Sequence, residues 1–68
     1  MTISLNGEPR EIGPEATVAA VLPLLDLPSD ARGVAVAVDT EVVPRGAWER
    51  TPLADGARVE VLTAMQGG

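Results

Sequence analysis

The spacing of the apolar residues changes twice along this chain, and this change limits the folds that it can adopt. Near the start, Ile3 and Leu5 alternate with polar residues, which is the period of a half-buried strand. Residues 17–25 instead place valine and leucine at i, i+3, i+4 and i+7, which is one face of a helix. From residue 34 the two-residue period returns. The order is strands, a helix, then strands, and it predicts an α+β fold.

A turn signal divides the first strand region. Asn6-Gly7 tolerates the positive φ angles of a tight hairpin, so we expect the chain to return as a second strand over residues 8–12. Pro9 has no N–H to donate to a strand ladder. The second strand should therefore lie at an edge of the sheet.

The helical segment contains a proline and should be short. Thr17 is the expected N-cap, because its hydroxyl can accept a hydrogen bond from an N–H group of the first turn. Pro23 lies too deep for the first turn, so it should kink the helix or end its regular bonding early. Pro28 marks the stop.

The second half of the chain is typical of three more strands. Valines at 34, 36 and 38 alternate with alanines, which predicts a strand with a bulky face and a small face. The elements expected after it are a turn at 39–41, a short strand at 41–43, a helical turn near Trp48, a turn at 55–56 and a last strand from 58 to about 64.

These elements predict a mixed sheet of four to five strands with one main helix packed on one face. The first and last strands should be neighbours in the middle. Because a helix covers one face only, the other face should stay partly open to a partner. Leu62 lies on the opposite side of the last strand from Val59 and Val61. It is therefore a candidate docking residue, and the alternative is an ordinary, partly buried strand residue.

The composition argues against several classes of function. The 68 residues suit a single domain over residues 1–68. There is no histidine or cysteine, so the usual general base, the best nucleophile and most zinc ligands are missing. We expect a protein that is not an enzyme and that holds no metal or stable cofactor. A net charge of −5 argues against nucleic acid, and the short apolar runs argue against a membrane span or signal peptide, so we expect a cytoplasmic location.

The last residues carry the chemical hypothesis. Gly67 and Gly68 follow a predicted strand, and glycine without a Cβ can pass through a narrow channel and leave its carbonyl carbon open to attack. We therefore expect residues 65–68 to form a flexible tail whose terminal carboxylate enters the active sites of other enzymes. The alternative is a pair of glycines that arose by chance in an unselected terminus.

Several stretches together resemble the ubiquitin-like β-grasp sulfur carriers. They are "ISLNGEP", "TVAAVL", "VAVDTEVVPRGAW" over residues 36–48, "LADGARVEVL" over 53–62, and the terminal "QGG". The chain is most similar to the ThiS family, the small sulfur carriers of thiamine (thiazole) biosynthesis, and the likeness covers nearly its whole length. It departs from the family pattern at Pro23, which interrupts the helix, and at Asp39, where asparagine is common.

The resemblance implies a ubiquitin-like β-grasp fold and a mechanism. An E1-like adenylyltransferase (ThiF-like) would use ATP and magnesium to adenylate the carboxylate of Gly68. Sulfur supplied through a cysteine desulfurase would then form a thiocarboxylate, and a thiazole synthase (ThiG-like) would receive that sulfur. Gly67, Gln66 and Met65 would be threaded into these partners. Arg45 and Trp48 match the family pattern, and we favour structural roles for both: Trp48 covering one end of the core and Arg45 pairing with an acid.

Three alternatives stay open from the sequence. The first is a sulfur carrier of another pathway, similar to the small subunit of molybdopterin synthase. The second is a β-grasp interaction module without carboxylate chemistry. The third is a protein modifier that forms an isopeptide bond to a target lysine.

Overall fold

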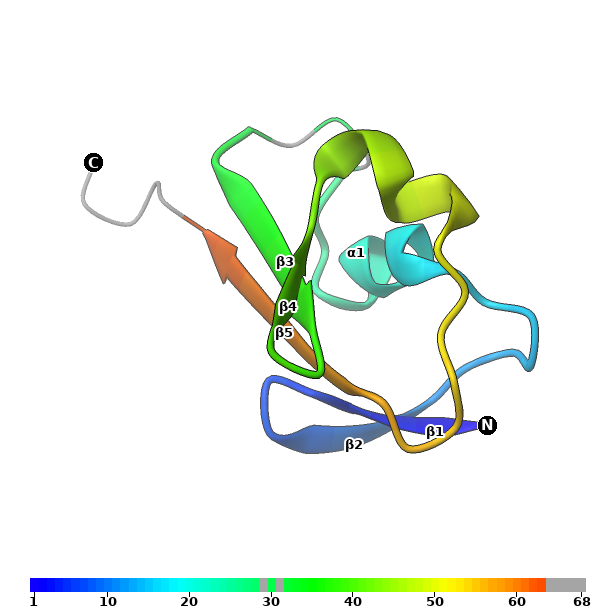
Figure 1. Cartoon of the computed structure of the whole chain (residues 1–68). Helices are drawn as coiled ribbons and strands as arrows, with labels where there is room; N and C mark the ends of the chain where they lie inside the picture. The colour runs from blue at the N-terminus through cyan, green and yellow to red at the C-terminus, as the bar shows by residue number, and fades with distance from the viewer. Residues whose placement is uncertain (29, 31, 64–68) are drawn as a thin grey trace.

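The computed structural model describes residues 1–28, 30 and 32–63. In this part of the chain five strands form one mixed sheet in the order β2-β1-β5-β3-β4 (Figure 1). The strands are β1 (Thr2–Leu5), β2 (Glu8–Glu11), β3 (Val34–Val38), β4 (Glu41–Val43) and β5 (Arg58–Thr63). The helical elements are the 3-10 helix η1 (Val18–Ala20), the α-helix α1 (Val21–Leu24) and the 3-10 helix η2 (Arg45–Arg50). β1 and β5 are parallel neighbours and the other pairs are antiparallel, which confirms the predicted α+β sheet.

The hairpin between β1 and β2 forms as its sequence predicts. Asn6 and Gly7 have φ angles of 52° and 86°, and Leu5 pairs with Glu8 across them. Two positive φ angles in a two-residue loop match the right-handed twist of the flanking strands. β2, which contains Pro9, is an edge strand, as expected.

The hairpin between β3 and β4 uses the same geometry without a glycine. Val38 pairs with Glu41, and the loop residues Asp39 and Thr40 have φ angles of 49° and 74°. Aspartate tolerates this left-handed region better than most residues, whereas a β-branched side chain is strained there. The prediction of a turn here was therefore right, but the strained backbone conformation of Thr40 was not foreseen.

The helical segment begins without the expected side-chain cap. Thr17 occupies the N-cap position in an extended conformation, but its side chain makes no capping hydrogen bond, so that prediction was wrong. The N–H of Val18 instead donates to the carbonyl oxygen of Thr51 at 2.9 Å. The segment after η2 thus supplies an acceptor for the first N–H group of η1.

Pro23 fits because the helix changes type before it. η1 is a 3-10 helix and α1 begins only at Val21, so Pro23 is the third residue of α1. The N–H groups of a first α-helical turn have no intrahelical acceptor, and the missing N–H of proline costs little there. The distortion that we expected from this proline therefore lies on its N-terminal side.

The helix ends in a Schellman motif. Asp26 has a φ of 59°, its N–H donates to the carbonyl oxygen of Pro23 at 3.1 Å, and the N–H of Leu27 donates to that of Leu22 at 3.0 Å. These two bonds satisfy carbonyl groups that a helix end leaves free. Pro28 follows directly and prevents the helix from resuming.

The core lies between the sheet and the helical elements. Its buried side chains are Ile3, Leu5, Val18, Val21, Leu22, Val36, Trp48, Leu53, Ala57, Val59 and Val61. Trp48 is only 3% exposed, and its Nε1 donates to the carbonyl oxygen of Val43 at 2.8 Å. The guanidinium carbon of Arg45 lies 4.7 Å from the centroid of the Trp48 ring, which is cation–π distance. Trp48 is thus a structural residue, as predicted; the pairing of Arg45 with an acid stays a prediction.

Candidate functional site

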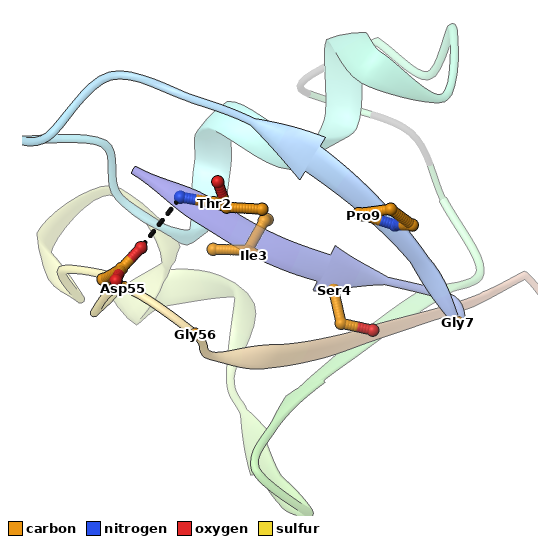
Figure 2. Close-up of a pocket in the computed structure, with 7 residues that line it drawn as sticks. All are labelled: Thr2, Ile3, Ser4, Gly7, Pro9, Asp55 and Gly56. Atoms are coloured by element: carbon orange, nitrogen blue, oxygen red, sulfur yellow. Dashed lines mark hydrogen bonds between the residues drawn. The ribbon is translucent and has the colours of Figure 1, made fainter.

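A shallow depression lies on the sheet where β1 meets β2 and the start of β5. Its volume is about 420 Å³, and it is lined by Thr2, Ile3, Ser4, Gly7, Pro9, Asp55 and Gly56 (Figure 2). The ionisable side chain in the lining of this depression is that of Asp55. The Oδ1 atom of Asp55 accepts a hydrogen bond from the backbone N–H of Thr2 at 2.9 Å. This carboxylate therefore holds the 55–56 turn against β1. The hydroxyls of Thr2 and Ser4 have no histidine in this chain to activate them.

Within the described residues, no three or more His, Cys, Asp or Glu side chains come together in a way that could hold a metal ion. None of the helices described there is long and apolar enough to cross a membrane.

The face of the sheet opposite the helix carries exposed apolar side chains, with the exposed Glu60 paired beside Ala37. Strand register places Ala35 beside Leu62 and Ala37 beside Val42, and alternate residues of a strand point to opposite faces. Leu62 is 70% exposed and Val42 is 73% exposed, whereas Val61 is buried. We call Ala35, Ala37, Val42 and Leu62 the open-face patch. The predicted exposure of Leu62 on this face is confirmed, and its docking role stays a prediction.

Val42 is the member of the patch that sequence reasoning missed. The strand at 41–43 was predicted, but three residues are too short to show which side faces the core. The pairing of Val38 with Glu41 settles the register, because it places Val42 on the same side of the sheet as Leu62. Hairpin register was the available signal: a two-residue turn at 39–40 implies this pairing.

The two hairpin turns hold β5 from both sides. On one side, the backbone N–H of Asn6 donates to the carbonyl oxygen of Val59 at 2.9 Å, and the Oδ1 atom of Asn6 accepts from the N–H of Val61 at 2.8 Å. On the other side, the N–H of Asp39 donates to the carbonyl oxygen of Arg58 at 2.8 Å, and its Oδ1 accepts from the N–H of Arg58 at 3.0 Å. The strand that leads to residues 64–68 is therefore fixed by side chains as well as by its neighbouring strands.

The predicted tail residues lie outside the described residues. Met65, Gln66, Gly67 and Gly68 are in this group, and their roles stay predictions. The structure does establish that β5, which leads to them, is a central strand with the exposed Leu62 one residue before its end.

The strand order, the parallel pairing of β1 with β5 and the helix between β2 and β3 define a ubiquitin-like β-grasp domain. The chain belongs to the ThiS family, whose family model matches residues 3–68. The resemblance drawn from the sequence is thereby confirmed.

Two solved structures and a curated relative agree with this assignment. The crystal structure of the thiamine biosynthesis protein ThiS from Geobacter metallireducens is 33% identical, each chain is covered completely, and the TM-score is 0.78. A solution NMR structure of a thiamine biosynthesis protein from the same organism is 33% identical with a TM-score of 0.77, and the match covers all of this chain and 88% of that one. A thiazole synthase of Paramagnetospirillum magneticum is 34% identical over 68 residues, which are all of this chain and 20% of that protein. The present chain thus spans about a fifth of this relative's length.

Proposed function

We propose that this chain is the sulfur carrier of thiamine biosynthesis, with the carboxylate of Gly68 as the carrying group. The observation that carries the proposal is the ThiS family match over residues 3–68, which extends through the terminal Gly67-Gly68. The two ThiS-type structures at TM-scores of 0.78 and 0.77 support it. The chain acts as a substrate of other enzymes and is not itself an enzyme.

The chemistry requires activation of the terminal carboxylate. An oxygen of Gly68 attacks the α-phosphorus of ATP on an E1-like adenylyltransferase, and pyrophosphate leaves. A thiol reductant releases hydrosulfide from the persulfide that a cysteine desulfurase forms, and is itself oxidised to a disulfide. The hydrosulfide attacks the carbonyl carbon, and AMP leaves. The resulting thiocarboxylate is a sulfur nucleophile tethered to the carrier. ATP and magnesium bind to the activating enzyme, and the carrier itself retains no cofactor.

A thiazole synthase is the proposed sulfur acceptor. The similarity to a much longer thiazole synthase supports this partner. The open-face patch is the proposed docking surface, because exposed apolar side chains of this size mark interaction sites when they cluster. Leu62 is its member on β5, the strand that leads to the tail. Residues Met65, Gln66 and Gly67 would then lead Gly68 into the acceptor's active site.

The proposal is tested by detecting the thiocarboxylate. The protein is incubated with ATP, magnesium, an E1-like activating enzyme and sulfide, treated with a thiol-reactive alkylating agent, and measured by intact mass. The chain has no cysteine, so one ATP-dependent adduct localised to Gly68 is the expected result. Alkylation also separates sulfur incorporation from methionine oxidation, which changes the mass by nearly the same amount.

A variant with one alanine added after Gly68 is the matched control. Its glycine carboxylate is converted to an amide, so it should form no adduct at Gly68. An unmodified wild-type chain, with an activating enzyme that labels another carrier in parallel, would contradict the proposal. That result would favour the interaction module, for which the added alanine is harmless.

A further inference from the structure

Among the residues that the structure describes, the backbone of β5 is paired on the β1 side only as far as the N–H of Val61. On the β1 side, the N–H of Ser4 donates to the carbonyl oxygen of Ala57 and that of Asn6 to the carbonyl oxygen of Val59, each at 2.9 Å. The Oδ1 atom of Asn6 then accepts from the N–H of Val61 at 2.8 Å. This last bond comes from a side chain because the chain turns away into β2 at Asn6.

The next two groups on that side have no partner among residues 1–28, 30 and 32–63. They are the C=O of Val61 and the N–H of Thr63, which point toward the β1 side because odd-numbered residues of β5 bond in that direction. We call these two groups the β5 free edge. Figure 1 shows β5 running past the end of the β1–β2 hairpin.

The free edge is nevertheless held in strand conformation from the other side. β3 pairs with β5 as far as Val34 with Thr63. The donor and acceptor of the free edge are therefore preorganised, and one residue of an added strand could bond to both. The two outer edges of the sheet are less suitable for such an addition, because β2 contains Pro9 and β4 has only three residues and is followed by Pro44.

We propose that the β5 free edge pairs with one extended backbone segment of the thiazole synthase that receives the tail. This inference rests on the proposed function. Residues 64–68 follow the free edge directly, so an added strand there would set the direction in which Gly68 leaves the domain. Backbone pairing supplies alignment, and the exposed Leu62, which lies between the two groups of the edge, supplies apolar contact on the open face. A second copy of this chain is the less suitable occupant, because each copy carries a net charge of −5.

Thr63→Pro removes the donor of the free edge and keeps the ladder with β3. The N–H of Thr63 points away from β3, and a proline is tolerated in a strand where the N–H faces outward. Thr63→Val is the matched control, because it keeps the N–H and the side-chain volume. Glu11→Pro is the second control, because it places a proline on the far edge strand β2, where the N–H also points outward.

Binding of each variant to purified thiazole synthase is measured by calorimetry, after circular dichroism has shown that it is folded. We expect Thr63→Pro to weaken binding about tenfold or more, since one hydrogen bond is lost and a backbone clash is added. Thr63→Val and Glu11→Pro should bind within about twofold of wild type. Equal affinities for Thr63→Pro and Thr63→Val would overturn the inference.

Amide hydrogen exchange by NMR is the second measurement and does not depend on a variant. The amide of Thr63 should exchange quickly in the free chain and at least about tenfold more slowly in the complex. Rapid exchange in a saturated complex would overturn the inference while leaving the proposed function standing. Failure of the wild-type chain to bind the synthase at all would instead overturn the proposed acceptor, and with it the inference.

Discussion

At the scale of single residues, the clearest backbone strain lies at Thr40. Its φ of 74° places a β-branched side chain in the left-handed region, which costs about 1–2 kcal/mol. Thr40→Gly should therefore raise the free energy of unfolding by about 1 kcal/mol after the greater flexibility of glycine in the unfolded chain is deducted. For a domain of this size, the midpoint of thermal unfolding should rise by about 4–8 °C, measured by circular dichroism.

Thr40→Ala separates strain from other effects of removing the side chain. Alanine keeps a Cβ at the same φ, so it should recover much less stability than glycine. Equal stabilisation by alanine and glycine would show that the positive φ is not the cause.

Single residues also show where sequence reasoning stops. The left-handed conformation was foreseen at Asn6-Gly7, because that pair is a local turn signal. It was not foreseen at Asp26, where the Schellman motif depends on the packing of Leu27 against the core. The cap expected at Thr17 does not form, and the N–H of Val18 donates to the carbonyl oxygen of Thr51, which is distant in sequence. Local sequence patterns predict hydrogen bonds between neighbouring residues, whereas the conformations at Asp26 and Thr17 depend on contacts with residues that are distant in sequence.

At the scale of elements, the side chain of Asn6 joins the β1–β2 hairpin to β5. It combines a φ of 52° with an acceptor for the N–H of Val61. Asn6→Gly keeps the turn and loses the acceptor, so it should lower the free energy of unfolding by about 1 kcal/mol. Asn6→Ala loses both features and should cost about 2–3 kcal/mol. Urea unfolding of each variant, with equal m-values as the check on two-state behaviour, measures the difference.

Asn6→Asp is the control for this hydrogen bond. Aspartate tolerates the same φ and offers an oxygen at the same position, so its free energy of unfolding should lie within about 0.5 kcal/mol of wild type. If Asn6→Gly were as stable as wild type, the bond to Val61 would contribute nothing to holding β5.

Among the elements, the strands were predicted more accurately than the helical parts. The alternation of valine and alanine in β3 and the turn signals around it were sufficient to place β3 and β4. The change from 3-10 to α-helix at Val21 was not visible, because the apolar period before Pro23 suits a continuous helix. η2 extends over Arg45–Arg50, longer than the single turn expected near Trp48, since burial of the indole ring stabilises a segment without a clear apolar period.

At the scale of the whole molecule, the two faces of the sheet differ in what they bury. One face packs against the helical elements, and its residues Ile3, Val36 and Val59 are almost fully buried. The other face exposes Leu62 and Val42, which are apolar side chains without a covering element in the described part of the chain. The sequence predicted this asymmetry from the presence of one main helix. It did not show that β4 adds Val42 to the open face, because the turn was expected over residues 39–41 and the two-residue loop that sets the hairpin register was not recognised.

A substitution in the open-face patch should weaken binding to thiazole synthase while leaving the free energy of unfolding nearly unchanged. Leu62→Glu should change the free energy of unfolding by no more than about 0.5 kcal/mol, because the side chain is 70% exposed. It should weaken binding to thiazole synthase about tenfold or more, since it places a charge within an apolar contact. Gly46→Glu is the matched control: it adds the same charge in η2, away from the open face, where an added Cβ meets no atom within 4 Å. Calorimetry gives the affinities and urea unfolding the stabilities. Unchanged affinity for Leu62→Glu would place the docking surface elsewhere. If Val42→Glu weakened binding to the same extent as Leu62→Glu, the partner would cover the face from β5 to β4.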